Sequence, residues 1–115
     1  MSVRCVLAAL GMWFLALPAL AEQDAPVLVV HDRQFLPQEL VLPAGVKLKL
    51  VVRNQDGIPL EFESYDLSRE AVIAGHSENT IYVGPLQPGR YRFFNDFNHA
   101  MQGTIVVRPA DGKGQ

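Results

Sequence analysis

Cysteine is almost absent from this sequence. Its only cysteine among 115 residues is Cys5, which lies in the first apolar segment of the chain. If that segment is removed on export, the remaining domain has no disulfide, no thiolate metal ligand and no cysteine nucleophile, although an oxidising compartment would permit disulfides. We therefore expect a domain held together by packing alone, which about 90 residues can achieve.

Long apolar runs are missing beyond the first 21 residues. That segment has Arg4 near its start, an apolar run from Cys5 to Leu17, and the small-residue stretch Ala19-Leu20-Ala21. This pattern is typical of a cleaved secretory signal peptide, and its apolar run is shorter than the roughly 20 residues that span a bilayer. We predict a signal peptide at residues 1–21 and one exported domain at residues 22–115, not embedded in a membrane.

An excess of positive charge is also missing. Once Arg4 is removed, nine lysines and arginines face twelve aspartates and glutamates. Nucleic-acid binding would need a basic stripe, so we expect no nucleic-acid partner. The sequence also has no Gly-rich phosphate loop, GxSxG, HExxH or paired CxxC motif, and we therefore predict no catalytic residues.

No segment of 11 or more residues shows helical periodicity, and apolar residues recur instead at every second position. The clearest case is VKLKLVVR, residues 46–53, where Val46, Leu48, Leu50 and Val52 alternate with other residues, as in a half-buried strand. Seven other segments are also predicted to be strands: residues 27–32, 38–45, 59–64, 71–75, 79–84, 90–95 and 103–108.

Proline and glycine mark the turns between these strands, at residues 43–45, 54–57, 74–75 and 87–89. Only Asp66 to Glu70 could form a helical turn. Short strands with turn signals every 8 to 12 residues or so favour an antiparallel sandwich or barrel. We therefore predict an all-β fold of about eight strands.

Carboxylates gather on one predicted strand, PLEFES. Glu61 and Glu63 are two residues apart and share one face, while Leu60 and Phe62 face the core. Two carboxylates on one strand face repel each other unless a cation or an arginine neutralises them. Two interpretations remain open, namely a metal site and a solvated acidic surface neutralised by arginines, for which the candidates are Arg69, Arg90 and Arg92.

Histidine and methionine could supply further metal ligands. His31 at a strand end and His76 in a turn are typical of surface histidines, whereas His99 and Met101 lie close together before the last strand. Carboxylate and imidazole suit Fe, Mn or Zn, and a thioether favours Cu(I). Both kinds of metal therefore remain open.

Three segments resemble the cupredoxins, the eight-stranded Greek-key sandwiches of plastocyanin and azurin. They are LPAGVKLKLVVRNQD (42–56), LQPGRYRF (86–93) and MQGTIVV (101–107), and the resemblance extends over residues 27–108. It implies a cupredoxin-like Greek-key β-sandwich.

The copper ligands of that family are only partly present. Type-1 copper is held by two His, one Cys and a weak axial Met. By position, the first His falls near Leu60, the Cys at Asn95, the second His at Asn98 or His99, and the Met at Met101. Two of the four ligands are missing, so we expect no type-1 blue-copper centre.

A narrower resemblance concerns PLEFESYDLSRE (59–70) and VGPLQPGRYRFFNDF (83–97). These segments resemble small periplasmic cupredoxin-like proteins encoded with bacterial ferrous-iron uptake systems. The resemblance implies a periplasmic accessory that binds Fe or Cu transiently and assists delivery or oxidation of iron. Its implied partners are an iron-uptake permease and a periplasmic copper-binding protein. That group usually has Asp-Phe-His where this chain has Asp96-Phe97-Asn98, with His99 one position later.

From this resemblance and the residue types, we predict metal contacts at Glu61, Glu63, Asp96, His99 and Met101. The alternative is a metal-free module that docks to a transporter or partner through EFESYDLSRE, residues 61–70. An enzyme acting alone is the least favoured interpretation, because the sequence has no electron carrier of its own.

Overall fold

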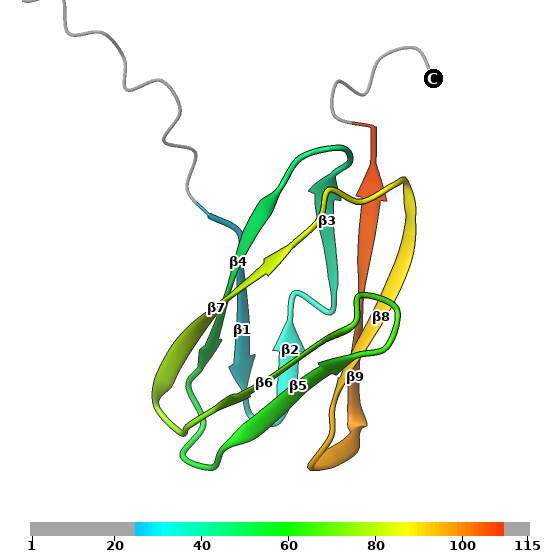
Figure 1. Cartoon of the computed structure of the whole chain (residues 1–115). Coiled ribbons are helices and arrows are strands. Elements are labelled where there is room, and N and C mark those ends of the chain that lie inside the picture. Colours follow the sequence, from blue (N-terminus) through cyan, green and yellow to red (C-terminus); the bar gives the residue numbers. More distant parts are fainter. Residues whose placement is uncertain (1–24, 110–115) are drawn as a thin grey trace, which may run out of the picture.

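The computed structural model describes residues 25–109, which form nine strands and no helix. The strands pair into a four-stranded sheet, ordered β2-β1-β4-β7, and a five-stranded sheet, ordered β3-β9-β8-β5-β6. Figure 1 shows these two layers. Their bounds are β1 Val27–His31, β2 Gln34–Leu36, β3 Glu39–Pro43, β4 Leu48–Asn54, β5 Leu60–Ser64, β6 Arg69–Ile73, β7 Ser77–Val83, β8 Gly89–Asn95 and β9 Asn98–Arg108.

This architecture confirms the predicted all-β sandwich, with nine strands where about eight were expected. The predicted signal peptide, residues 1–21, lies outside the residues that the structure describes. Within residues 25–109, no helix is long and apolar enough to cross a membrane.

Strand direction differs from the antiparallel arrangement that we predicted. Most neighbouring strands are antiparallel, but β1 runs parallel to β4, and β3 runs parallel to β9. Alternation of apolar and polar residues is the same in either orientation, so the sequence pattern does not report it. The sandwich is therefore mixed.

The strand missing from the prediction is β2, which forms a tight hairpin with β1. Its turn places Asp32 and Arg33 at φ values of 51° and 59°, a conformation that usually requires Asn-Gly or a similar pair. Here the carboxylate of Asp56 stabilises the turn, because it accepts hydrogen bonds from the backbone N–H groups of Asp32 and Arg33, each at 2.8 Å. The stabilising residue is more than twenty positions away, so no local signal marks the hairpin.

The segment at residues 66–70 is also not the helical turn that we considered. It belongs to a β5–β6 hairpin in which Ser64 pairs with Arg69, and residues 65–68 form the turn. The Ser68 N–H donates to the Tyr65 carbonyl at 3.2 Å. This register places Glu63 directly opposite Glu70.

The core lies between the two sheets and is centred on aromatic rings. Phe93 stacks on Phe62 with ring centroids 5.3 Å apart, and it meets Phe35 edge to face at 4.9 Å. On β4, Leu48, Leu50 and Val52 are buried as predicted, whereas Val46 precedes the strand and is exposed. The core thus fixes which face of β5 and β8 points outward.

Candidate metal centre

Three glutamates meet on the outer face of the five-stranded sheet. Glu61 and Glu63 alternate with the buried residues of β5, and Glu70 lies opposite Glu63 on β6. One carboxylate oxygen from each lies within 4.8 Å of the others. We call Glu61, Glu63 and Glu70 the glutamate cluster.

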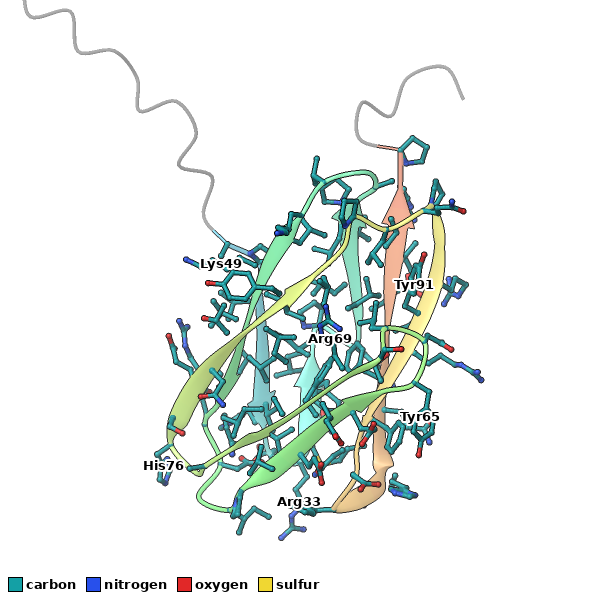
Figure 2. All side chains as sticks on the ribbon, in the orientation of Figure 1. Arg33, Lys49, Tyr65, Arg69, His76 and Tyr91 are labelled. Carbon is teal, nitrogen blue, oxygen red and sulfur yellow. The ribbon has the colours of Figure 1, made fainter. Side chains whose placement is uncertain are left out.

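The arginines considered as neutralising partners are engaged elsewhere. Arg69, labelled in Figure 2, donates to the Tyr82 carbonyl on β7 and to the Ser68 carbonyl, both at 2.9 Å. The other two pair with carboxylates outside the cluster, Arg90 with Glu39 and Arg92 with Asp66. Between residues 25 and 109, no lysine or arginine forms an ion pair with the glutamate cluster. Among the acidic residues of segment 61–70, only Asp66 therefore has an arginine partner within residues 25–109.

Partial burial and neighbouring carboxylates raise the pKa of two members of the glutamate cluster. Partial burial is the largest cause of the raised pKa of Glu61, and the negative charges of Asp96 and Glu70 raise it further. Partial burial likewise raises the pKa of Glu63, and Glu70 is the charged neighbour that adds most. A bound cation would relieve this repulsion, because it stabilises the ionised form of every carboxylate around it.

The β8–β9 turn brings an aspartate and a histidine to the same region. The Asp96 Oδ1 and His99 Nε2 atoms lie 2.9 Å apart, and the Asp96 N–H donates to the Glu61 carbonyl at 2.8 Å. The His99 and Phe94 rings meet edge to face, with their centroids 5.1 Å apart, and Phe94 pairs with Glu63 across the sheet. The structure therefore gathers four of the five predicted ligands in one area.

Met101, the fifth predicted ligand, lies in the core. Its side chain is buried, and its sulfur accepts a hydrogen bond from the Asn95 Nδ2 atom at 3.3 Å. The outer carboxylates and the Met101 thioether thus belong to different environments, one facing solvent and one facing the core.

The residues present do not fit a type-1 copper centre. Leu60 and Asn95, which stand where the resemblance places a histidine and the cysteine, are both buried. The Asn95 Oδ1 atom is engaged by the backbone, since it accepts from the Glu61 and Phe97 N–H groups at 2.9 and 3.0 Å. In the part of the chain that the structure describes, no thiolate replaces them.

The remaining histidines are surface residues, as predicted. His31 lies near Asp32 and Asp56 in a second acidic group, but both oxygens of Asp56 already accept backbone hydrogen bonds. Figure 2 places His76 at the β6–β7 turn, away from Tyr65. Neither histidine belongs to the glutamate cluster.

A groove of about 490 Å³ lies beside the cluster on the same face. Tyr65, which is 75% exposed, lines this groove. Its ring meets that of Phe94 edge to face, with the ring centroids 5.5 Å apart. The groove is also lined by Gln38, Arg92, Gln102 and Thr104. An exposed aromatic side chain beside a groove is a feature of recognition surfaces.

Sequence reasoning did not select Glu70, Tyr65 or Phe94 as site residues. Glu70 lies in the predicted docking segment, residues 61–70, and its position opposite Glu63 depends on the hairpin register. Interpreting residues 65–68 as a four-residue hairpin turn would have placed Glu70 opposite Glu63. Tyr65 lies in the same segment, but its contact with Phe94 could not be predicted, because it joins β8 to a distant turn.

Comparison with known proteins gives one curated relative and many solved structures of similar fold. An uncharacterized protein of Rickettsia prowazekii (strain Madrid E) is 37% identical over 81 residues, which cover 70% of this chain and 65% of that protein. The chain therefore spans somewhat less than two thirds of that relative.

The similar solved structures include amicyanin and another cupredoxin, both of low sequence identity. Amicyanin from Paracoccus versutus has a TM-score of 0.59 and 17% identity, covering 81% of this chain and 86% of its own. A novel purple cupredoxin from Nitrosopumilus maritimus has a TM-score of 0.57 and 16% identity, covering 74% of this chain and 100% of its own. At these identities the likeness supports the fold alone.

A family model described as a cupredoxin-like domain matches residues 5–107. That match covers most of the chain and agrees with the two-sheet sandwich and with the similar solved structures. This chain therefore belongs to the cupredoxin-like domain family.

Proposed function

We propose that this protein is a periplasmic metal-binding accessory of ferrous-iron uptake. It holds Fe(II) transiently at the glutamate cluster, with Asp96 and His99 beside it, and passes the ion to a membrane permease. The observation that carries the metal-binding part is the convergence of three carboxylates with which no lysine or arginine of residues 25–109 forms an ion pair. The link to iron uptake rests on the resemblance of residues 59–70 and 83–97 to that group of proteins.

The donor set favours a hard divalent ion. Carboxylate oxygens, with imidazole nearby, suit Fe(II) or Mn(II), whereas Cu(I) prefers thiolate and thioether sulfur. The one thioether close to this region, that of Met101, is buried and hydrogen-bonded to Asn95. A partly exposed site also lets the ion leave for another protein, as a delivery role requires.

Assisted oxidation is the second role that the resemblance implies. It would remove one electron from bound Fe(II) and reduce a separate acceptor, for which the copper-binding partner protein is the candidate. The Fe(III) product would remain on oxygen ligands.

Anaerobic calorimetric titration of the purified protein with Fe(II), Mn(II), Cu(I) and Cu(II) tests the proposal. We expect Fe(II) and Mn(II) to bind more tightly than about 0.1 mM, roughly −5.5 kcal/mol, and the double variant Glu63→Gln/Glu70→Gln to lose this binding. Glu78→Gln is the matched control, because Glu78 pairs with Arg53 on the other sheet. If none of the ions binds the wild-type protein more tightly than about 0.1 mM, the proposal is wrong.

A metal-free docking module is the second candidate, and the exposure of Tyr65 beside the groove favours it. In that role the acidic and aromatic surface would bind the permease or the copper-binding partner directly. Binding of such a partner to chelator-treated protein would support this function if Glu61→Ala/Glu63→Ala abolished the binding. Loss of binding on chelation alone would instead support the metal-dependent function.

A further inference from the structure

Asn95 links three parts of the five-stranded sheet although its side chain is only 4% exposed. Its Oδ1 atom accepts from the Glu61 N–H on β5, at 2.9 Å, and from the Phe97 N–H in the β8–β9 turn, at 3.0 Å. Its Nδ2 atom donates to the Met101 sulfur on β9, at 3.3 Å. One buried amide therefore ties β5 and β9 to the turn between β8 and β9.

The turn is tied to β5 a second time. The Asp96 N–H donates to the Glu61 carbonyl at 2.8 Å, so both backbone polar groups of Glu61 are held by two adjacent residues, Asn95 at the end of β8 and Asp96 in the turn. Without these hydrogen bonds, repulsion between the Glu61 and Asp96 carboxylates would drive the turn away from β5. The strand register between β8 and β9 changes at Phe94 and Asn95, and regular pairing of β8 with β5 ends at Asn95, opposite Phe62, so the hydrogen bonds to Glu61 extend that pairing into the turn.

We infer that Asn95 is a positioning residue that holds Asp96 against Glu61 and thereby sets the cation affinity of the glutamate cluster. This inference rests on the proposed function, and it adds a residue that does not itself touch the ion. Groups that orient metal ligands in this way typically contribute 10- to 100-fold, roughly, in metal affinity.

A second buried asparagine provides a matched control. Asn54 is 1% exposed, its Nδ2 atom donates to the Ile58 carbonyl at 2.8 Å, and its Oδ1 atom accepts from the Asp56 N–H at 3.0 Å. Its Nδ2 atom also donates to the Ile73 and Ala74 carbonyls, at 3.3 and 3.2 Å. Removing its amide therefore disturbs the β4–β5 connection and the end of β6, and it removes none of the hydrogen bonds of Asn95. Met101→Leu is a further control, because it removes only the sulfur acceptor.

Titration of the full protein with Mn(II) tests the inference. We expect Asn95→Ala to weaken Mn(II) binding about 10-fold or more, and Asn54→Ala and Met101→Leu to change it about twofold or less. Equal affinity of folded Asn95→Ala and wild-type protein would overturn the inference and leave the proposed function intact. Absence of Mn(II) and Fe(II) binding to the wild-type protein would instead overturn the proposed function, and with it the claim about affinity.

Amide hydrogen exchange of the wild-type protein tests, without any variant, whether the Asn95 side chain holds the Glu61 and Phe97 N–H groups. Phe97 is 58% exposed and lies in a turn, so its N–H should exchange rapidly unless the Asn95 side chain protects it. We expect protection of both the Phe97 and the Glu61 N–H groups. Exchange of the Phe97 N–H at the rate of an unprotected amide would overturn the inference even if Asn95→Ala failed to fold.

Discussion

At the scale of single residues, Gly103 allows the last strand to pass close to the aromatic core. It pairs with Phe93 across β8 and β9, and a Cβ atom at this position would overlap the Phe93 ring. The same atom would lie 2.9 Å from the backbone carbonyl oxygen of Gln38. Phe93 cannot move easily because it is packed between Phe35 and Phe62, and the Gln38 carbonyl is held by a hydrogen bond from the Thr104 N–H at 2.9 Å.

We therefore predict that Gly103→Ala lowers the free energy of unfolding by about 1–3 kcal/mol, the usual cost of inserting a methyl group into a packed core. Urea denaturation measures the change. Gly57→Ala is the control, because its Cβ atom would approach only the exposed His76 ring, at 3.3 Å. An unchanged midpoint for Gly103→Ala would show that the core has room at this position.

At the scale of elements, the β5–β6 hairpin creates the repulsion within the glutamate cluster. Its register sets Glu63 opposite Glu70, and like charges directly opposite each other destabilise a sheet. Because the pKa of Glu63 in the folded protein is raised above 4.5, the folded state binds this proton more strongly than the unfolded chain does. The contribution of Glu63 to stability therefore falls as the pH rises through the window above 4.5.

Glu63→Gln should therefore raise the Tm of the metal-free protein at neutral pH. The gain should shrink as the pH falls toward 4.5, because the raised pKa of Glu63 means that this carboxylate is protonated in the folded protein at a higher pH than in the unfolded chain. Thermal unfolding followed by circular dichroism at several pH values measures the effect. Glu78→Gln should give no such gain, because it removes the ion pair with Arg53, and a lower Tm for Glu63→Gln at neutral pH would refute this explanation.

The elements also show what the sequence could and could not predict. Alternation in β5 predicted correctly that Leu60 and Phe62 are buried and that Glu61 and Glu63 lie outside. Alternation carries no information on strand partners, so the two parallel pairs were not predicted. The β1–β2 hairpin was also missed, since its turn depends on Asp56 rather than on local residues.

For the candidate site, too, the sequence predicts what lies within one strand but not which strands come together. Glu61 and Glu63 could be predicted to share a face because they occupy one strand. Their proximity to Glu70 and Asp96 depends on hairpin register and on the hydrogen bonds of Asn95, which join segments over thirty residues apart. Residue types therefore suggested candidate ligands, and tertiary structure was needed to assemble the glutamate cluster.

At the scale of the whole molecule, two acidic groups differ in whether their oxygens are free. Asp32 and Asp56 adjoin the β1–β2 turn of the four-stranded sheet, and both Asp56 oxygens accept backbone hydrogen bonds. The glutamate cluster lies on the five-stranded sheet beside the groove, where neither arginine nor lysine side chains of residues 25–109 form ion pairs with it. A cation should therefore prefer the five-stranded sheet.

Paramagnetic broadening of backbone amide NMR signals by Mn(II) tests this central claim most directly, because it locates the ion on the folded protein. Substoichiometric Mn(II) should first broaden the amide signals of Glu61, Glu63 and Glu70, together with that of Asp96. Broadening centred on Asp32 and Asp56, or no broadening at Mn(II) concentrations near 0.1 mM or so, would contradict the account.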